Sequence, residues 1–358
     1  MSRILVALSG GVDSTVAAAL LLEQGHDIAG VTLKLWGGDS DSGCCSVADV
    51  DDARRVAQQL GIRHHVFNFG EDFNTNVVDP YVRAHSIGET PNPCVECNRF
   101  LKFDRLLHRA LQLGFDAVAT GHHVRRVALA DGTFAVGRGH DPAKDQSYVV
   151  HMLDQAVLAD TLFPVGELTK MEVRAKATAM GLRTADKAES MEVCFIAETG
   201  GGRRVFLGDR IPLRPARVVD ATGAQVGSTD AVELVTVGQR RGLGLPGGGE
   251  KQYVVDVDVE TGVVTVGGAD ALLRPTVTLH SVSLLLGFQP LTGLLRAQMS
   301  AHGRPVACTA AIDGDDLVVT FASPQTRVAP GQSVVLYAAN PCDANGPEIV
   351  VAGGLARR

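Results

Sequence analysis

Two groups of residues in this sequence have the types and spacing to do chemistry. The first is the hexapeptide SGGVDS at residues 9–14, which combines two glycines, two serine hydroxyls and a carboxylate. It follows an apolar run at 4–8 that predicts a buried strand, and it precedes an Ala- and Leu-rich run at 15–23 that predicts a helix. A glycine-rich turn at a helix N-terminus presents unpaired backbone N–H groups, so this segment predicts a phosphate site.

Each residue type in this turn has a physical role. We expect Gly10 and Gly11 to adopt positive φ angles and to let the backbone approach an anion. Ser9 and Ser14 add hydroxyl donors, and Asp13 is an oxygen ligand for magnesium. The alternative interpretation is an ordinary capped turn between a strand and a helix. No G-x-x-x-x-G-K-[ST] motif occurs, so the segment is not a Walker loop.

The second group is a set of three cysteines. Cys94 and Cys97 have C-x-x-C spacing, and Cys194 follows far downstream in a β-like run at 193–196. The two prolines and the glycine within 87–97 predict a loop, and the apolar spacing over 98–113 predicts a helix. Cys97 is therefore expected at a helix N-terminus, where the dipole lowers the pKa of a thiol.

The other cysteines give weaker signals. Any single cysteine is most often a small buried hydrophobe, and we interpret Cys308 and Cys342 in this way. Cys44 and Cys45 lie in a segment rich in Gly, Ser and Asp and have no evident partner. A zinc site usually needs four Cys or His ligands at characteristic spacings, and that pattern is not present. Seven cysteines without an export signal indicate cytoplasmic thiols rather than disulfides.

The first part of the chain alternates between β-like and helix-like runs, which predicts an α/β fold with a doubly wound parallel sheet. Ligands of such sheets bind at the carboxyl ends of strands, where the glycine-rich turn, Leu33 and Gly121 are expected. The predicted strands are 4–8, 28–35, 65–69 and 117–120, and the predicted helices are 15–23, 47–60, 73–83 and 98–113.

Three further elements are expected before the composition changes. Residues 125–136 predict a hairpin that turns at Asp131-Gly132, and 145–153 predict a helix. Thr169 and Glu172 have the spacing of a capping box, ahead of a helix that ends at Gly181.

From about residue 206 the sequence consists of short β-like runs separated by glycine-bearing turns, which is typical of barrels and sandwiches. We predict three domains, 1–205, 206–272 and 273–358, of which the last two are small β domains. Residues 242–247 match G-x-G-x-x-G but lead into no helix, so we interpret them as a loop. The predicted strands are 216–221, 233–237, 253–259, 263–266, 277–286, 294–299, 306–312, 316–321 and 333–337.

Composition limits the possible classes of protein. The 358 residues are 45% apolar and 20% charged, which is normal for a globular protein of two or three domains. No apolar run is long enough to span a membrane, and no signal peptide precedes the first strand, so we expect a cytoplasmic protein. The net charge of −7 is a mild argument against a nucleic-acid partner.

Local basic segments offset this argument. Residues 203–217 contain five arginines and one acid, a local charge of +4, and Arg125-Arg126 and Arg240-Arg241 are basic pairs. Solvated charged faces are the alternative interpretation of such pairs.

Several motifs together indicate a family. SGGVDS resembles the pyrophosphate loop of the N-type ATP pyrophosphatases, which cleave ATP between its α and β phosphates. The full set resembles the bacterial tRNA-specific 2-thiouridylases, and it extends over nearly the whole chain. The motifs, in chain order, are SGGVDS, TPNPCVECNRFLKF, ATGHHVRR, KDQSYVV, LFPVGELTKMEVR, MEVCFI and TVGQRRGLGLPGG.

This resemblance implies a pyrophosphatase-type domain, a central β domain and a C-terminal β-barrel. It implies that ATP adenylates O2 of the wobble uridine of tRNA and that sulfur then displaces AMP. The implied partner is a protein that donates persulfide or sulfide. In the persulfide route the donor transfers persulfide sulfur to Cys194, and Cys97 attacks this persulfide, freeing hydrogen sulfide or forming a Cys97–Cys194 disulfide.

The resemblance also implies binding residues. Asn92, Pro93 and Cys94 would lie against the target base, which must be flipped out of its stack. The implied tRNA contacts are His122, Lys144, Asp145, Gln146 and Gln332. The implied ATP contacts are Ala7, Leu8, Ser9, Gly10, Gly11, Val12, Asp13, Ser14, Leu33 and Gly121, with magnesium.

The sequence departs from the family pattern at two places. Many relatives have Asp where Cys94 stands, and that Asp is proposed to serve as acid and base. Cys94, Cys97 and Cys194 could instead be three ligands of a [4Fe–4S] cluster, an alternative to persulfide chemistry. Near Ser300-Ala301-His302, relatives tend to have an Arg-Tyr pair for tRNA, which is absent here.

Two other functions remain open from the sequence alone. One is a different pyrophosphatase-type ligase, such as an amidotransferase, which would use the same loop without needing Cys97 and Cys194. The other is an RNA-binding protein with a vestigial ATP loop, although all the polar residues of that loop are present.

Overall fold

The computed structural model describes residues 1–35, 47–188, 193–196, 201–247, 249–285 and 293–358. By its internal contacts the chain divides into two compact units. The first comprises 1–77, 94–197 and 339–351, and the second comprises 78–93, 198–338 and 352–358. No helix in the described parts of the chain is both long and apolar enough to cross a lipid bilayer.

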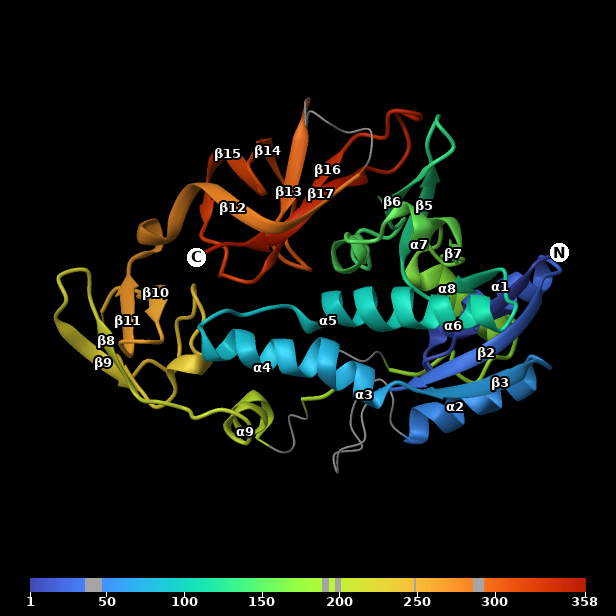
Figure 1. Cartoon of the computed structure of the whole chain (residues 1–358), viewed down its shortest axis with the longest axis horizontal. Helices are drawn as coiled ribbons and strands as arrows, with labels where there is room; N and C mark the ends of the chain where they lie inside the picture. Colours follow the sequence, from blue (N-terminus) through green and yellow to red (C-terminus); the bar gives the residue numbers. More distant parts are fainter. Residues whose placement is uncertain (36–46, 189–192, 197–200, 248, 286–292) are drawn as a thin grey trace. The chain divides into compact units, whose positions relative to one another are not determined.

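A five-stranded parallel sheet with the order β3-β2-β1-β4-β7 is the centre of the first unit (Figure 1). Residues 4–6 of its middle strand are fully buried, as expected for a strand covered on both faces. This confirms the predicted doubly wound sheet. The strands are β1 (Arg3–Ala7), β2 (Asp27–Lys34), β3 (Arg63–Asn68), β4 (Ala117–Ala119) and β7 (Thr161–Leu162).

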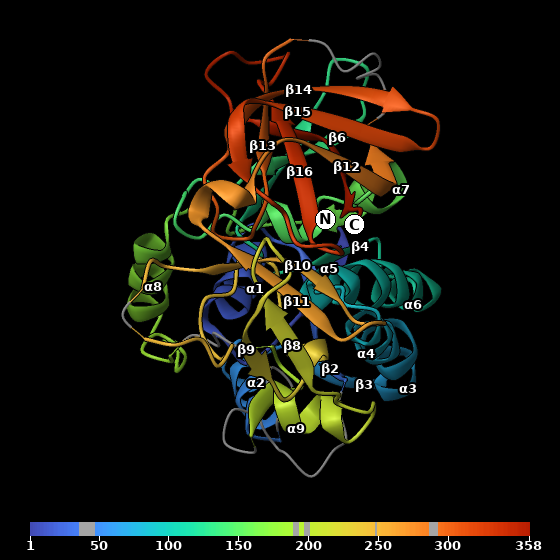
Figure 2. The same ribbon diagram turned by 90° about the vertical axis from the view of Figure 1, so that its left-hand side faces the viewer.

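Helices cover both faces of this sheet (Figure 2). On one face, Ala18 and Leu21 of α1 (Val12–Glu23) and Ala53 and Ala57 of α2 (Val47–Gln59) pack on apolar residues of β1. α8 (Lys170–Ala179) packs against α1, and α6 (Leu106–Gln112) lies against β4. These contacts hold the N-terminus of α1 at the carboxyl end of β1, where the phosphate site is predicted.

The helix after the Pro-containing segment begins earlier than predicted. α5 (Pro93–Glu96) continues into the π-helical segment η2 (Cys97–Arg105) and then into α6. Proline at the first helical position is favoured because its missing N–H needs no partner there, and this explains the early start. The predicted loop over 87–97 is therefore wrong in its last residues. Cys94 occupies the first turn, and Cys97 lies in the second.

Other predictions for the first unit have mixed outcomes. The hairpin is confirmed as β5 (Val124–Ala128) and β6 (Phe134–Arg138), and so is the capping box of Thr169 and Glu172. The helix predicted over 145–153 is only a 3-10 turn, and the strand predicted over 193–196 is a turn. The helix predicted over 73–83 is confirmed, within an unbroken helical run over 70–86 that has a π-helical segment in its middle. The short helical elements are α3 (Gly70–Phe73), η1 (Asn74–Val78), α4 (Asp79–Ser86), η3 (Ser147–Val150) and α7 (Gln155–Ala159).

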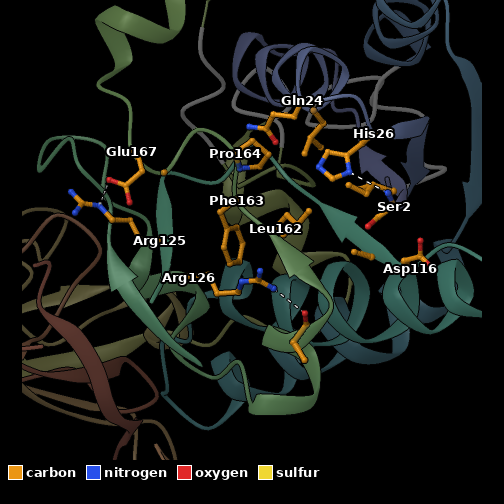
Figure 3. A pocket seen from close by; sticks show the side chains of 15 residues that line it. Ser2, Gln24, His26, Asp116, Arg125, Arg126, Leu162, Phe163, Pro164 and Glu167 are labelled. Carbon is orange, nitrogen blue, oxygen red and sulfur yellow. Dashed lines mark hydrogen bonds and ion pairs between the residues drawn. The ribbon is translucent and has the colours of Figure 1, made fainter. Parts of the chain in front are cut away.

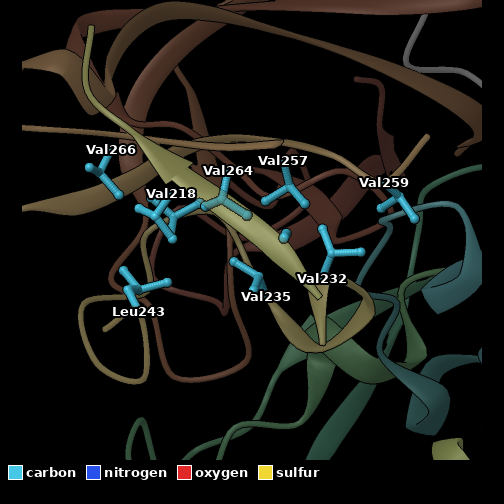
Figure 4. Packing of buried hydrophobic residues seen from close by; sticks show 10 residues of the cluster. Val218, Val232, Val235, Leu243, Val257, Val259, Val264 and Val266 are labelled. Atoms are coloured by element: carbon cyan, nitrogen blue, oxygen red, sulfur yellow. The ribbon is translucent and has the colours of Figure 1, made fainter. Parts of the chain in front are cut away.

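The second unit contains a four-stranded sheet with the order β10-β11-β8-β9 and its own apolar core, which is rich in valine (Figure 4). β9 was not predicted because its five residues are mostly polar or glycine. The strand predicted over 233–237 is wrong, because a 3-10 turn places the buried carboxylate of Glu233 in an ion pair with half-exposed Arg214. The elements are α9 (Gly202–Gly208), β8 (Ala216–Val219), β9 (Gln225–Thr229), η5 (Val232–Leu234), β10 (Tyr253–Asp258) and β11 (Val263–Gly267).

The last strands form a closed six-stranded barrel, which confirms the predicted β-barrel. Its order is β12-β15-β14-β13-β16-β17, and β17 closes it by pairing with β12. The first residue of β17, Ile349, also pairs with Gly137 of β6. The domain boundaries at 205 and 272 remain predictions. The elements are η6 (Ala269–Leu272), β12 (Leu273–Leu284), β13 (Leu295–Gln298), β14 (Val306–Asp313), β15 (Asp316–Thr326), β16 (Ser333–Ala338) and β17 (Ile349–Ala356).

Candidate active site

The predicted phosphate loop lies between β1 and α1, at the carboxyl edge of the sheet. Gly10 has φ +73°, and a Cβ atom there would lie 2.7 Å from the backbone oxygen of Asp49. Only glycine meets both conditions without rearrangement. Gly11 has φ −91°, so the expectation of a positive φ is wrong for this residue. Gly11 instead serves as the extended N-cap of α1, and it has no side chain to cap the helix.

Hydroxyl groups brace this loop from within. The backbone N–H of Ser9 donates to Ser14 Oγ over 3.3 Å, and Ser14 Oγ donates to the Gly11 carbonyl over 3.1 Å. Thr15 Oγ1 donates to the same carbonyl over 2.8 Å. The N-cap residue Gly11 provides no side-chain hydrogen bond to the first turn of α1, so the structure as described leaves these amide groups to an anion at the positive end of the helix dipole.

Asp13 is held by two basic side chains. Lys170 Nζ lies 2.8 and 2.7 Å from its two carboxylate oxygens, and His123 Nε2 lies 3.1 Å from Oδ1. Burial by itself would raise the pKa of Asp13, but the hydrogen bonds from His123 and Lys170 outweigh this effect and lower it. The carboxylate is therefore ionised and oriented, and a magnesium ion at Asp13 would compete with Lys170 for the same oxygens.

A second lysine, Lys187, forms ion pairs beside the phosphate loop. Lys187 Nζ bonds Asp49 Oδ1 at 2.9 Å and Asp52 Oδ2 at 2.7 Å, in the first turns of α2. Burial by itself would lower the pKa of Lys187, but the hydrogen bonds that its ammonium group donates to both aspartates outweigh this effect and raise the pKa. Since the Asp49 backbone also limits the space at Gly10, this ion pair fixes the wall against which the loop packs.

The structure brings Gly121 to the phosphate loop as predicted from its position after β4. A Cβ atom on Gly121 would lie 2.5 Å from the Ser14 backbone nitrogen. Leu33, near the carboxyl end of β2, is 7% exposed, and Leu8 is 2% exposed. These positions share the carboxyl edge of one sheet. Their contact with ATP remains a prediction.

The predicted RNA segment 144–146 is connected to this loop through His123. The His123 backbone N–H donates to Gln146 Oε1 over 2.9 Å, and the Gln146 N–H donates to the His123 carbonyl over 3.1 Å. The carboxylate of Asp145 is 6% exposed and accepts four hydrogen bonds, from Arg138, the Gly139 amide and both the amide and the hydroxyl of Ser147. Asp145 thus shapes the segment that presents Lys144 and Gln146.

Other residues named for the RNA and the target base are placed as follows. His122 is buried, bonds Thr120 Oγ1 at 2.8 Å and packs its ring against Phe103, and burial lowers its pKa well below the usual value. In the second unit, the Gln332 side chain donates to the Thr90 carbonyl. Asn92 is half-buried and Pro93 is buried. The roles of these residues remain predictions.

The three cysteines lie on the first unit. Cys94 is exposed, Cys97 is 7% exposed and Cys194 is half-buried on a turn. The ring of Phe195 packs edge-on against Phe73 of α3 at 5.5 Å, and α3 packs against η2, which begins at Cys97. The Phe195–Phe73 contact therefore holds the turn with Cys194 against α3, and α3 in turn packs against the helical segment that carries Cys97.

The cysteines do not form a metal-binding group in this structure. Among the described residues, no three His, Cys, Asp or Glu side chains are arranged to hold a metal ion, so the iron–sulfur alternative has no preformed ligand set here. Cys308 is buried, and burial raises its pKa to about 11, which agrees with a structural role. Cys342 is exposed, so its predicted burial is wrong. Cys44 and Cys45 lie outside the described residues.

Sequence reasoning did not assign roles to His123, Lys170 or Lys187. One signal was available for Lys170, because it occupies the first position of α8, where a positive charge opposes the helix dipole. A lysine that is 9% exposed at such a position needs an acidic partner, which here is Asp13. Lys187 and His123 carry no comparable local signal, since their partners are distant in sequence.

A separate pocket of about 500 Å³ in the same unit includes Ser2, which precedes β1, and Ala117, which begins β4 (Figure 3). Arg125 and Arg126 line it, but Arg125 pairs with Glu167 at 3.2 Å and Arg126 donates to the Ala159 carbonyl over 2.8 Å. The basic pair of the sequence is therefore anchored within the protein and is not a free cationic surface.

Comparisons with known proteins cover the whole chain. The family described as "tRNA methyl transferase HUP domain" matches residues 2–198, the "tRNA methyl transferase PRC-barrel domain" matches 204–268, and the "Aminomethyltransferase beta-barrel domain" matches 274–342. The chain is 44% identical over 365 residues to the tRNA-specific 2-thiouridylase MnmA of Chloroflexus aurantiacus, covering 100% of this chain and 99% of that one. It is also 44% identical to the MnmA of Mycolicibacterium gilvum, covering 95% and 96% of the two chains.

Similarity to solved structures is weak by comparison. The U34-tRNA thiolase NcsA from Methanococcus maripaludis, solved with its [4Fe-4S] cluster, is 18% identical with a TM-score of 0.36, covering 58% of this chain and 63% of that one. The whole-length relatives and the three matched domains lead to one conclusion: the chain belongs to the tRNA-specific 2-thiouridylase family.

Proposed function

We propose that this protein uses ATP to replace O2 of the wobble uridine of tRNA with sulfur. The observation that carries the proposal is the phosphate loop, whose geometry suits a pyrophosphate, in a chain 44% identical over its whole length to tRNA-specific 2-thiouridylases. Family membership supplies the RNA substrate. The loop supports a reaction that begins with ATP.

In the first step, O2 of the uracil attacks the α-phosphorus of ATP. The bond to the β-phosphate breaks, pyrophosphate leaves, and O2 is converted into the adenylate. The first-turn amides of α1 and the ammonium group of Lys170 would bind the phosphates, because both are positive and both adjoin Asp13. Asp13 would then be free to help bind the magnesium that accompanies ATP.

In the second step, sulfur attacks C2 and AMP leaves with the original oxygen. We assign the persulfide to Cys194 and the attacking thiolate to Cys97. Attack of Cys97 on the Cys194 sulfur forms the Cys97–Cys194 disulfide and releases hydrosulfide, which becomes the thiocarbonyl sulfur. A thiol reductant then restores both cysteines. The alternative route, in which Cys94, Cys97 and Cys194 are three ligands of a [4Fe–4S] cluster that delivers the sulfur, is tested separately below.

The placement of the thiols is compatible with these roles. Cys97 lies in a π-helical segment, a rare geometry that often occurs at functional sites. Cys97 is only 7% exposed, so its side chain is largely shielded from solvent. Cys94, in the first helical turn, has the position that favours a thiolate electrostatically, so it is the candidate for the acid and base role that an aspartate has in relatives.

The test measures pyrophosphate release and 2-thiouridine formation with purified tRNA and a persulfide donor. Cys97→Ser and Cys194→Ser should each abolish thiolation while retaining tRNA-dependent pyrophosphate release, and Cys342→Ser, at an exposed cysteine, should change neither. A Cys97→Ser enzyme with full activity would indicate a different pyrophosphatase-type ligase. RNA binding without pyrophosphate release would indicate a binding protein.

The sulfur mechanism needs its own measurement. Anaerobically purified protein should be free of iron and acid-labile sulfide and should still thiolate tRNA from the persulfide donor. Near-stoichiometric iron and sulfide, lost in Cys94→Ala, would replace the persulfide assignment with a three-cysteine cluster.

A further inference from the structure

Four arginines from three distant segments of the sequence converge on one cavity in the second unit. The cavity has a volume of about 350 Å³ and is bounded by the start of β12, the end of β15 and residues 357–358. It is lined by Arg274, Arg327, Arg357 and Arg358, with the hydroxyls of Thr276 and Thr326, and no Asp or Glu lines it. This concentration of guanidinium and hydroxyl donors is suited to an anion.

The arginines are held in place from behind. Arg357 forms a bidentate pair with Asp316, at 2.7 Å for both contacts, and Arg327 bonds Asp256 at 3.1 Å and the Val255 carbonyl at 2.8 Å. Each guanidinium has five N–H donors, so these bonds orient the groups and leave donors for a ligand.

The other two arginines have no acid within ion-pair distance in the described structure. Arg274 donates to the carbonyls of Ala271 and Leu273, and Arg358 donates to the Val257 carbonyl. Asp258 lies close enough to Arg358 for a charge interaction without forming an ion pair. The four arginines therefore carry more charge than the three nearby aspartates. These aspartates, Asp256, Asp258 and Asp316, all lie outside the cavity lining.

The arginine-rich stretch of the sequence behaves differently. Arg203 bonds the Leu234 carbonyl, Arg210 lies on the Phe206 ring at 4.0 Å, and Arg214 pairs with buried Glu233. Those side chains stabilise the second unit locally, and none of them lines a cavity described here. The basic site of this unit is formed by tertiary structure.

We propose that this cavity binds a backbone phosphate of the tRNA, an inference that rests on the proposed function. The protein has a net charge of −7, so binding a polyanion requires local clusters of arginine or lysine. The only aromatic residue in the lining, Phe321, is 6% exposed and offers no open face for a base. The site therefore recognises phosphate, positions the RNA and carries no sequence specificity.

The experiment measures the dissociation constant of the full-length protein for an unmodified tRNA transcript over a series of salt concentrations. Arg274→Ala with Arg358→Ala should weaken binding about tenfold and reduce the magnitude of the salt slope by about two, one for each lost phosphate contact. Arg274→Lys with Arg358→Lys should keep most of the slope. Arg296→Ala, at an exposed arginine on β13 outside the cavity, is the matched control.

The outcomes separate this inference from the proposed function. An unchanged dissociation constant and slope in the double alanine variant, with thiolation intact, would overturn the inference alone. Saturable binding of inorganic phosphate or ATP that depends on these arginines, without an effect on tRNA affinity, would assign the cavity to a free phosphate ligand. Weakened RNA binding in a protein that never thiolates tRNA would support the cavity and reject the proposed function.

Discussion

The two ends of the proposed reaction are built in different ways. At the phosphate loop, Lys170 bonds Asp13 at 2.7 Å. The backbone of Asp49 leaves no room for a Cβ atom at Gly10, and the backbone of Ser14 leaves none at Gly121. At the sulfur end, Cys94, Cys97 and Cys194 form no common group among the described residues, although one packed layer connects their elements. The phosphate loop proposed for ATP is therefore braced by fixed contacts, whereas the three cysteines form no metal-binding group among the described residues.

This difference follows from what each half-reaction needs. Binding of phosphates depends on backbone amides and charges that gain strength from being fixed in advance. Persulfide transfer requires a donor protein to reach one cysteine and a second thiol to attack it later, so this half of the reaction depends on access to the sulfurs. We expect changes at the loop to affect ATP chemistry strongly, and changes around the cysteines to affect access.

Removing the charge of Lys170 should have the largest effect. Lys170→Met leaves Asp13 without its closest cation and removes a positive charge from the phosphates, so tRNA-dependent pyrophosphate release should fall by about 10²–10³-fold. Lys176→Ala in the same helix is the control and should be near normal. A variant with normal pyrophosphate release would contradict the preorganised ATP site.

A methyl group on Gly121 tests the close packing of the loop. The Cβ of Gly121→Ala would lie 2.5 Å from the Ser14 nitrogen, so the first turn of α1 must shift. We expect ATP affinity, measured by titration calorimetry, to fall by about tenfold or more, with a loss of roughly 1–3 kcal/mol in stability. Gly249→Ala, where a Cβ meets nothing within 4 Å, should leave both unchanged.

Alkylation of the cysteines tests the other half of the comparison. In the absence of substrates, iodoacetamide should modify exposed Cys94 about tenfold faster than Cys97, which is 7% exposed. Peptide mass spectrometry follows both sites in one sample. Faster labelling of Cys97 would mean that the helix opens readily in solution. Cys97 would then not be shielded from solvent in the free protein.

Substitution of His123 tests whether the phosphate loop is coupled to the predicted RNA segment 144–146. Its ring contacts Asp13 and its backbone bonds Gln146, so it is a positioning residue between the phosphate loop and the predicted RNA segment. We expect tRNA binding to increase ATP affinity through this contact, and we expect His123→Gln to reduce that coupling factor about fivefold while tRNA affinity without ATP stays constant. An unchanged coupling factor would show that the contact is only structural.

The smallest expected effect is on the free energy of unfolding at low pH. His151, on the segment that follows Gln146, is 5% exposed, and neither of its ring nitrogens has a partner in the described structure. Burial, helped by the charge of Arg99, lowers its pKa to about 3. The unfolded chain therefore binds a proton below about pH 6.5 that the folded protein rejects, so stability falls as the pH drops toward 3.

This acid dependence can be isolated by substitution. The contribution of His151 is at most about 1.4 kcal/mol per pH unit. His151→Gln should flatten the decline of the thermal midpoint between pH 6.5 and 4.5 relative to the parent protein, and exposed His302→Gln should not. Parallel declines in parent and variant would mean that His151 is protonated in the folded state.

Much of the fold could be predicted because local patterns decide it. The buried runs of β1 and β2, the capping box at Thr169 and the hairpin turn at Asp131-Gly132 are each determined by residues near in sequence. The predictions failed where tertiary contacts, rather than the local sequence pattern, determine the secondary structure. Glu233 leaves a β-like run because Arg214 pairs with it, and Phe195 packs on Phe73 rather than joining a sheet.

The candidate site shows the same division. The glycines and hydroxyls of the loop were evident because they are contiguous. The partners of Asp13 come from residues 123 and 170, and nothing in their local sequence connects them to the loop. Cys97 was misplaced by one helical turn because the proline that precedes Cys94 begins the helix and does not end the loop.

Strand β17 has a consequence for how the protein is made. Its first residue pairs with β6 and its later residues close the barrel against β12, some seventy positions earlier in the chain. During synthesis on the ribosome, the edges of β12 and β16 stay open until residue 356 has emerged, and open edges invite pairing with other nascent chains. A slow emergence of β17 would favour aggregation, so chaperone demand should be highest after β16 has been synthesised and before β17 has emerged.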